Sequence, residues 1–171
     1  YYEATISSRG EQLEHFTSLG VALSLMCRNP LLEYGPKAYE DHKKKLSTYD
    51  VEQVVLAIVV TTGIASIFLT KDFTPDYNSG LAHAIFYALT SYPVIEKNHL
   101  HGEVVGFGVL LALLVDGEET EFEKVYELNK KIHLPVSLEE IEITEEQWEE
   151  SMNRIPEMSD VAHYPYKVTK E

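Results

Sequence analysis

The sequence predicts an all-α fold, a bundle of helices in a single domain over residues 1–171. Apolar residues recur at spacings of three and four along most of the chain, which is the period of an amphipathic helix. No segment shows a convincing alternation of apolar and polar residues, the pattern of a half-buried strand. Helix-capping residues also precede several of the periodic segments. These observations favour helices packed on helices.

Three helices are expected before residue 71. The segment 10–29 carries an apolar stripe at helical spacing, and Pro30 should end this helix. The stripe consists of Leu13, Phe16, Leu19, Leu23 and Met26. The segment 30–47 predicts a shorter helix with a polar outer face. The segment 50–70 begins at Asp50, a favourable N-cap, and is apolar on almost every side, which predicts a helix buried at the centre of the bundle.

A loop and three further helices follow. Pro, Asn, Ser and Gly residues make 71–80 a loop, and 93–98 should be a connection. Helices are predicted over 80–92, 100–115 and 118–133. The last of them is amphipathic, and its inward face should be formed by Phe122, Val125, Tyr126, Leu128 and Ile132.

Two capping boxes, SLEE at 137–140 and TEEQ at 144–147, each predict the start of a short helix. After Pro156 the tail is expected to be irregular. A chain of 171 residues lies in the usual range for one domain. It can bury roughly 70% of its unfolded surface, so it needs no disulfide or metal to fold.

Composition restricts the class of partner. The chain has 28 acidic residues against 14 Lys and Arg, a net charge of −14. This balance argues against a nucleic acid or an anionic membrane surface as partner and favours a solvated acidic surface. Cys27 is the single cysteine, which leaves no disulfide framework or thiolate metal cluster and indicates a reducing, cytoplasmic location.

No membrane segment is expected. The longest apolar candidate, 54–69, falls short of the ~18 uninterrupted apolar residues of a membrane span. The residues that interrupt it are Thr61, Thr62, Gly63 and Ser66. No secretory signal opens the chain, and its first residues already follow a helical pattern, so we expect a helical part of a longer protein.

Histidines cluster in the apolar stretch 80–108. His83 and His101 lie on consecutive predicted helices, and imidazole is a common zinc or iron ligand, although such a site needs a third protein group. Spacing alone does not pair them, because two antiparallel helices would bring the start of the second near the end of the first. The alternative is a pair of core or capping imidazoles bonded to backbone carbonyls. His99 should point away from His101, as a loop or solvent residue.

The same stretch contains GEVVGFG, with glycines at 102, 106 and 108. A dinucleotide site needs a strand, a glycine-rich turn and a helix N-terminus at the pyrophosphate. These glycines follow no strand and lie inside a predicted helix. Close packing between helices is therefore the favoured role for them.

Five segments carry a family resemblance. GLAHAIFYALT and NHLHGEVVGFGVL resemble the metal-binding segment of the iron-containing alcohol dehydrogenase superfamily, and within it the glycerol dehydrogenases. YYEATISSRG near the start, HLPVSLEEIEIT and AHYPYKVTKE near the end also resemble segments of that family, in the same order. The HGE element alone is shared with dehydroquinate synthases, but the ordered matches extend over the whole chain.

The resemblance implies a two-domain enzyme. Its amino-terminal Rossmann-like domain binds NAD or NADP, its carboxyl-terminal helical domain binds a divalent metal, zinc or iron, and the substrate lies between them. His83 and His101 match the two histidine ligands of the family. The aspartate ligand would precede Tyr1, so residues 1–171 would be the helical metal- and substrate-binding domain without the Rossmann-like domain. This implies a homo-oligomeric enzyme acting on a small alcohol or polyol, of which the isolated chain should be inactive.

Two departures bear on the substrate. Phe86 replaces a histidine that often borders the substrate pocket in the family, and this would remove a hydrogen-bond partner for a polyol. His163 matches a family position near the pocket. The long segment 62–80 is closer to members that reduce 2-oxo acids, the hydroxycarboxylate dehydrogenase-like branch. Asp72 and Asp76 in it would be plain loop carboxylates or pocket residues.

Two other functions remain open. A dehydroquinate synthase-like lyase would share the superfamily, but SGLAHAIFYAL lacks the first histidine and the glutamate usual in that helix. A helical oligomerisation module without activity would keep the histidines as relics.

Overall fold

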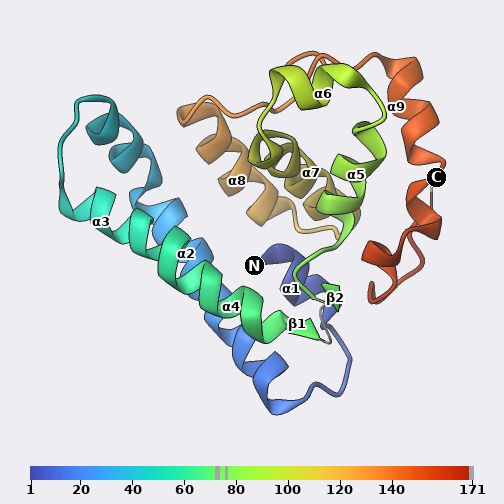
Figure 1. The fold of residues 1–171 in the computed structure, drawn as a ribbon, viewed down its shortest axis with the longest axis horizontal. Helices are drawn as coiled ribbons and strands as arrows, with labels where there is room; N and C mark the ends of the chain where they lie inside the picture. Colours follow the sequence, from blue (N-terminus) through green and yellow to red (C-terminus); the bar gives the residue numbers. More distant parts are fainter. Residues whose placement is uncertain (72–73, 76, 170–171) are drawn as a thin grey trace.

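The computed structural model describes residues 1–71, 74–75 and 77–169, and its architecture is helical (Figure 1). The α-helices are α1 (Tyr2–Ser7), α2 (His15–Lys43), α3 (Tyr49–Leu56), α4 (Thr62–Leu69), α5 (Leu81–Leu89), α6 (Pro93–Asn98), α7 (His101–Val115), α8 (Glu119–Lys131) and α9 (Glu145–Met152). Two-residue strands β1 (Thr70–Lys71) and β2 (Thr74–Pro75) pair antiparallel within the predicted loop. The all-α prediction is confirmed, and this small ladder is the one exception among the described residues.

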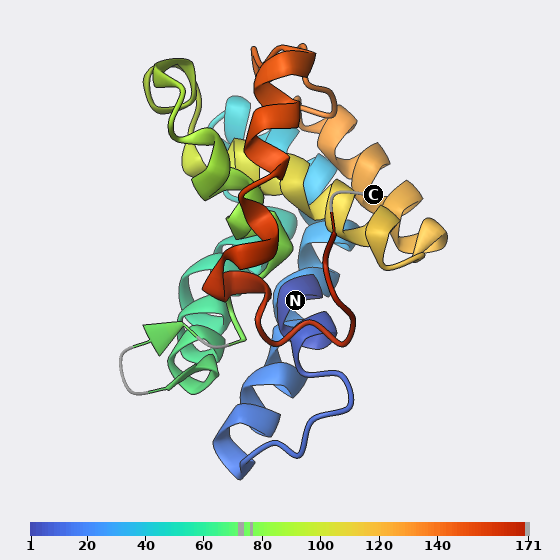
Figure 2. The same ribbon diagram turned by 90° about the vertical axis from the view of Figure 1, so that its right-hand side faces the viewer.

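The helices form a body and an arm. In the arm, α2 runs antiparallel to the long helix made by α3, the π-helical turn η1 (Ala57–Thr61) and α4 (Figure 1). In the body, α5 packs against α7, and α9 with the short helices η2 (Ile155–Glu157) and η3 (Ser159–Val161) covers α5 (Figure 2). The core lies between these elements and includes Ile85, Leu89, Val104 and Phe107. Helix α8 contacts both α7 and α2 and so joins the two parts.

Helix α2 contradicts the predicted stop at Pro30. The helix continues for 29 residues with Pro30 and Pro36 inside it. An internal proline removes one backbone hydrogen bond and costs about 3 kcal/mol or more. Packing against α3, η1 and α4 along one side and α8 along another offsets that cost. The prediction of separate helices over 10–29 and 30–47 was therefore wrong.

The buried face of α2 is made of small residues. Gly20, Ser24 and Ala38 are buried, whereas Phe16 and Met26 of the predicted apolar stripe are 65% and 54% exposed. A Cβ atom at Gly20 would lie 2.9 Å from Cγ of Leu69. The side chain of Leu69 thus packs directly on the α2 backbone at Gly20, whereas Phe16 and Met26 of α2 stay on the outside.

The segment 50–70 is not the buried central helix that its composition predicts. Val59 and Ile67 are 68% and 72% exposed, and in this segment only Ala57, Ala65 and Leu69 are buried. The reason is that α2 is its main packing partner and covers one side only. By length and composition alone, the continuous helix Tyr49–Leu69 would also suffice to cross a membrane, with a mean hydropathy of 2.0 over its most apolar window. We had expected the polar residues within this segment to exclude a membrane span, but by length and composition they do not.

Local signals predicted some helix ends correctly and missed others. The Thr144 hydroxyl accepts from the Gln147 N–H, and the Gln147 side chain accepts from the Thr144 N–H, so the capping box of α9 is confirmed. The box at 137–140 begins turns and not a helix. Helix α6 replaces the predicted connection 93–98. In the arm, Thr48 and not Asp50 is the N-cap of α3.

Candidate metal centre

The two histidines predicted as ligands lie side by side. His83 is in the first turn of α5 and His101 is the first residue of α7. The centroids of their rings are 5.4 Å apart, at an interplanar angle of 43°. Sequence spacing did not predict that His83 and His101 would meet, because we had expected their helices to be antiparallel neighbours. Instead, α6 separates the two helices, and α7 crosses α5 so that its first turn meets the turn carrying His83 and Phe86.

Gly108 permits this crossing. A Cβ atom at Gly108 would lie 2.7 Å from the carbonyl oxygen of Ala82 and 2.9 Å from its Cα. No side chain fits between backbones at that distance. The predicted packing role of the glycines is therefore confirmed for Gly108, whereas Gly102 has no atom within 4 Å of such a Cβ.

Glu3 of α1 fixes the start of α5. Its Oε1 accepts hydrogen bonds from the backbone N–H groups of Gly80 (2.9 Å) and His83 (3.0 Å). Its Oε2 lies 2.6 Å from Nδ1 of the His83 ring. A carboxylate at a helix N-terminus is favourable because the first N–H groups have no partner within the helix. Sequence reasoning did not single out Glu3, because it lies 80 positions from His83 and belongs to no spacing motif.

The two rings titrate differently. Burial favours the neutral form of His83, but the hydrogen bond and charge of Glu3 outweigh it, so the pKa of His83 is raised. Burial, followed by the neighbouring His83, lowers the pKa of His101. His101 is therefore the more readily neutral ring, and neutral imidazole is the form that binds metals.

A cavity of about 520 Å³ adjoins His83 between α1, α2, α4, α7 and α8. Its lining is mainly apolar, with Glu3, Arg28, Asn78 and His83 among the polar side chains. Within residues 1–71, 74–75 and 77–169, no group of three or more His, Cys, Asp or Glu side chains could hold a metal ion. The described part of the chain thus offers a pair of imidazoles and no complete ligand set.

The predicted pocket residues lie in different places. The ring of Phe86 packs edge-on against His101, with centroids 4.3 Å apart. Nδ1 of His163 lies 2.9 Å from Oε1 of Glu11, and its ring is 4.7 Å from that of Tyr77. Neither residue lines the cavity beside His83. Asp72 and Asp76 are outside the described residues.

His99 lies between α6 and α7, as predicted, but its side chain is only 10% exposed, so the expectation of a solvent residue was wrong. Its ring nitrogens lie 3.6 Å from Glu103 and 3.3 Å from Glu142.

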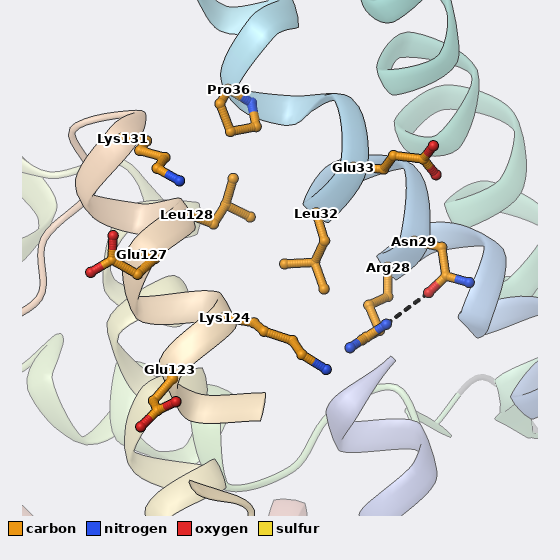
Figure 3. A pocket seen from close by; sticks show the side chains of 10 residues that line it. All are labelled: Arg28, Asn29, Leu32, Glu33, Pro36, Glu123, Lys124, Glu127, Leu128 and Lys131. Carbon is orange, nitrogen blue, oxygen red and sulfur yellow. Dashed lines mark hydrogen bonds between the residues drawn. The ribbon is translucent and has the colours of Figure 1, made fainter. Parts of the chain in front are cut away.

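A second groove, of about 610 Å³, lies between α2 and α8 and includes neither His83 nor His101 (Figure 3). Its lining mixes charges of both signs: Arg28, Lys124 and Lys131 with Glu33, Glu123 and Glu127. We propose no ligand for this groove, because its lining carries both positive and negative side chains and favours neither an anion nor a cation.

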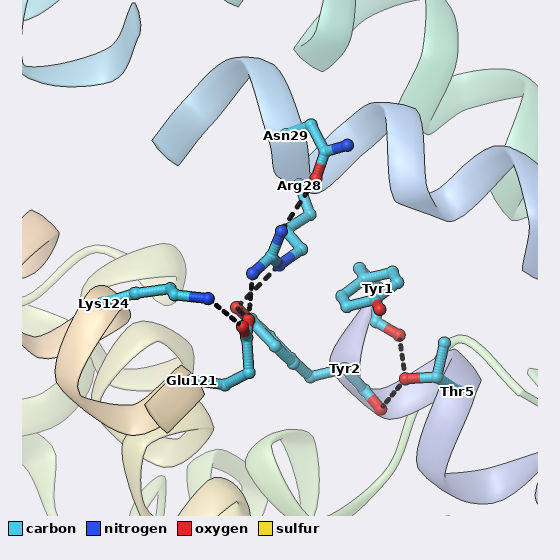
Figure 4. Close-up of polar contacts among 7 residues, drawn as sticks. All are labelled: Tyr1, Tyr2, Thr5, Arg28, Asn29, Glu121 and Lys124. Carbon is cyan, nitrogen blue, oxygen red and sulfur yellow. Dashed lines mark hydrogen bonds and ion pairs between the residues drawn. The ribbon is translucent and has the colours of Figure 1, made fainter. Parts of the chain in front are cut away.

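At one end of this groove a polar cluster joins three helices (Figure 4). The carboxylate of Glu121 accepts from the Tyr2 hydroxyl (2.9 Å), from Lys124 (2.7 Å) and from Arg28. The Arg28 Nε–H also donates to the Tyr2 oxygen, at 3.1 Å. Burial would raise the pKa of Glu121, but these donors outweigh it and lower the pKa to about 2. The cluster ties α1, on which Glu3 lies, to α2 and α8.

The chain is similar in sequence to parts of several known dehydrogenases. It is 36% identical over 126 residues to the glycerol dehydrogenase of Thermotoga maritima, covering 70% of this chain and 31% of that protein. It is 31% identical over 134 residues to the glycerol dehydrogenase of Escherichia coli O6:H1, covering 76% and 33%. With hydroxycarboxylate dehydrogenase A of Escherichia coli K12 it shares 29% identity over 144 residues, 84% of this chain and 38% of that protein. The chain spans about a third of the length of these curated relatives.

Solved structures agree on the fold. A probable glycerol dehydrogenase from Sinorhizobium meliloti superposes with a TM-score of 0.76 and 22% identity, over 98% of this chain and 47% of that one. The glycerol dehydrogenase of Schizosaccharomyces pombe gives a TM-score of 0.79 and 22% identity, over 98% and 43%. No family model matches the sequence. The chain therefore belongs to the iron-containing alcohol dehydrogenase superfamily, as a helical domain related to the glycerol dehydrogenases.

Proposed function

We propose that this chain is the metal- and substrate-binding domain of an NAD(P)-linked alcohol dehydrogenase, with His83 and His101 as two ligands of a divalent metal. The observation that carries the proposal is the 5.4 Å separation of these two rings on crossed helices. The relatives are dehydrogenases, which favours this activity over a dehydroquinate synthase-like lyase.

The donor chemistry fits zinc or iron, both of which accept imidazole nitrogen. Two imidazoles need a further protein ligand, and we infer that an aspartate outside this chain supplies it. When bound, the metal would act as a Lewis acid on the substrate oxygen. His83 and His101 would hold it through neutral ring nitrogens, and Phe86 would close one side of the site with an apolar ring.

We propose a small alcohol or polyol as substrate, with a 2-oxo acid as the alternative. A small alcohol or polyol agrees with the glycerol dehydrogenase relatives, and a 2-oxo acid agrees with the hydroxycarboxylate dehydrogenase. Phe86 offers no hydrogen bond, so a polyol would bind with one polar partner fewer than a histidine would give. We further propose that NAD or NADP binds in an amino-terminal Rossmann-like domain. The glycines at 102–108 do not offer a dinucleotide-binding turn, because they lie within α7.

Zinc titration of the 171-residue chain tests the ligand pair. We expect weak binding, with a dissociation constant above the micromolar range, because only two protein ligands are present. His83→Ala and His101→Ala should each abolish measurable binding, whereas His42→Ala on the exposed face of α2 should leave it unchanged. The chain alone should not reduce NAD in the presence of glycerol.

Tight, sub-micromolar binding lost in His83→Ala would reveal a third ligand within this chain and refute the assignment of that ligand elsewhere. Binding that survives both His83→Ala and His101→Ala would refute the histidine pair itself. Calorimetry at neutral pH measures both quantities.

The exposed apolar face of the arm favours a second, compatible function in self-association. Val59 and Ile67 are 68% and 72% exposed, and several more apolar side chains of this helix face solvent beside them. A contiguous exposed apolar surface is typical of an interaction site. We propose that a second copy of the protein covers it, as the isologous contact of a homo-oligomer.

Replacing Val59 and Ile67 together by lysine should convert an oligomer into a monomer, because two charges would be placed within an apolar contact. Light scattering after size exclusion measures the mass. Leu100→Lys is the control, since Leu100 is 74% exposed and belongs to the body, where it is the N-cap of α7. A wild-type chain that is monomeric at high concentration would contradict this function.

A further inference from the structure

Glu3 is unusual among the acidic residues because both of its carboxylate oxygens bind the segment that carries His83. The side chain is only 10% exposed. One oxygen accepts from the backbone N–H groups of Gly80 and His83, and the other lies 2.6 Å from Nδ1 of His83. These contacts hold His83 at two points, at its backbone N–H and at Nδ1 of its ring.

The contact with the ring also selects its tautomer. An ionised carboxylate can only accept hydrogen bonds, so Nδ1 of His83 must carry the hydrogen. A neutral ring protonated at Nδ1 keeps its lone pair on Nε2. Histidines that bind metals commonly donate their other N–H to a carboxylate, which sets the ring orientation and makes the ligating nitrogen more basic.

We propose that Glu3 is the positioning residue of the histidine pair, which holds His83 in the Nδ1–H tautomer so that Nε2 is the nitrogen available to the metal. This inference rests on the proposed role of His83 and His101 as ligands. Glu3 acts through His83 and does not itself bind the metal. Helix α1 thus connects to the site through one buried carboxylate.

Glu3→Gln separates the two tasks of the side chain. The amide oxygen should stay with the two backbone N–H groups, because the reverse orientation would oppose the NH₂ group to both of them. The NH₂ group, a donor, then faces Nδ1. Nδ1 must accept, and the hydrogen moves to Nε2. Long-range ¹H–¹⁵N spectra of the ¹⁵N-histidine-labelled, metal-free chain should show the Nδ1–H tautomer at His83 in the wild type and the Nε2–H tautomer in the variant.

Zinc affinity, measured by titration in the same spectra, should fall about ten- to hundredfold in Glu3→Gln. Glu142→Gln is the matched control, because it removes a carboxylate 3.3 Å from another histidine, His99. It should change neither zinc affinity nor the His83 tautomer. Circular dichroism establishes that each variant is folded. Glu3→Asp, which keeps a carboxylate, should retain more of the zinc affinity than Glu3→Gln.

The outcomes distinguish this inference from the proposed function. If zinc binding is lost in His83→Ala but is unchanged in Glu3→Gln, the positioning role of Glu3 is overturned and the proposed function stands. Zinc binding abolished in Glu3→Gln with the tautomer unchanged makes Glu3 a direct ligand and also overturns that role. Zinc binding that is absent, or independent of both histidines, overturns the proposed function, whatever tautomer the spectra show.

Discussion

Replacing Gly108 by alanine should lower the free energy of unfolding by about 1–3 kcal/mol, the usual cost of overpacking a core. The added Cβ would lie 2.7 Å from a carbonyl oxygen and 2.9 Å from Cα of Ala82, atoms of the α5 backbone that cannot rotate away. Helix α7 must therefore move off α5. Since these helices carry His101 and His83, the same displacement should separate the two rings and weaken zinc binding.

Gly63→Ala is the control for this experiment. Gly63 lies in α4, is exposed, and has no atom within 4 Å of an added Cβ. Alanine there should stabilise the chain by up to about 1 kcal/mol through helix propensity. Denaturant unfolding of both variants gives the comparison. Equal and small changes at the two positions would show that α5 and α7 do not meet as closely as described.

The second large effect is expected at Glu121. Glu121→Gln should lower the free energy of unfolding at neutral pH by about 1.5–3 kcal/mol, the value of hydrogen bonds to charged groups. The variant leaves Arg28, whose side chain is 16% exposed, without its carboxylate, and weakens the bond from Tyr2. Glu123→Gln on the exposed side of the same helix should change stability by no more than about 0.5 kcal/mol.

This effect should depend on pH in a defined direction. The pKa of Glu121 falls from 4.5 to about 2 on folding, so the carboxylate contributes its full stability above pH 4.5. That contribution is lost as the pH falls toward 2, where the folded protein also takes up the proton. The stability difference between the wild type and Glu121→Gln should therefore shrink steadily over this range. A difference that is constant with pH would contradict the role of the charge.

Sequence patterns predicted the body of the fold better than the arm. The helices α5, α7 and α8 and the cap at Thr144 depend on local spacing and local hydrogen bonds, and the sequence contains both. The path of α2 through Pro30 depends on packing against other helices, which no local pattern reports. The exposure of Val59 in η1 and of Ile67 in α4 depends on how many helices surround the arm, and composition alone suggested complete burial.

The candidate site shows the same division. His83 and His101 were identified by resemblance to a family, and their side-by-side placement depends on a crossing angle that spacing does not encode. Glu3 was not identified, because its importance arises only when α1 reaches the start of α5. The role of Gly108 was foreseen in kind, since a glycine within an apolar helix suggests close packing, but its contact with Ala82 required the tertiary structure.

The π-helical turn at Ala57–Thr61 alters the angular phase of the long arm helix. In an uninterrupted α-helix the side facing α2 at Ala57 would return at Ile64 and Phe68, whereas the buried residues are Ala65 and Leu69. The backbone N–H of Thr62 donates to the carbonyl of Ala57, five residues back, so one extra residue is accommodated in the turn. The side chains of α4, beyond this turn, are therefore rotated by about 100° about the helix axis. This phase shift turns Ala65 and Leu69 toward α2 and the cavity beside His83, and leaves Ile64 and Ile67 on the outer surface.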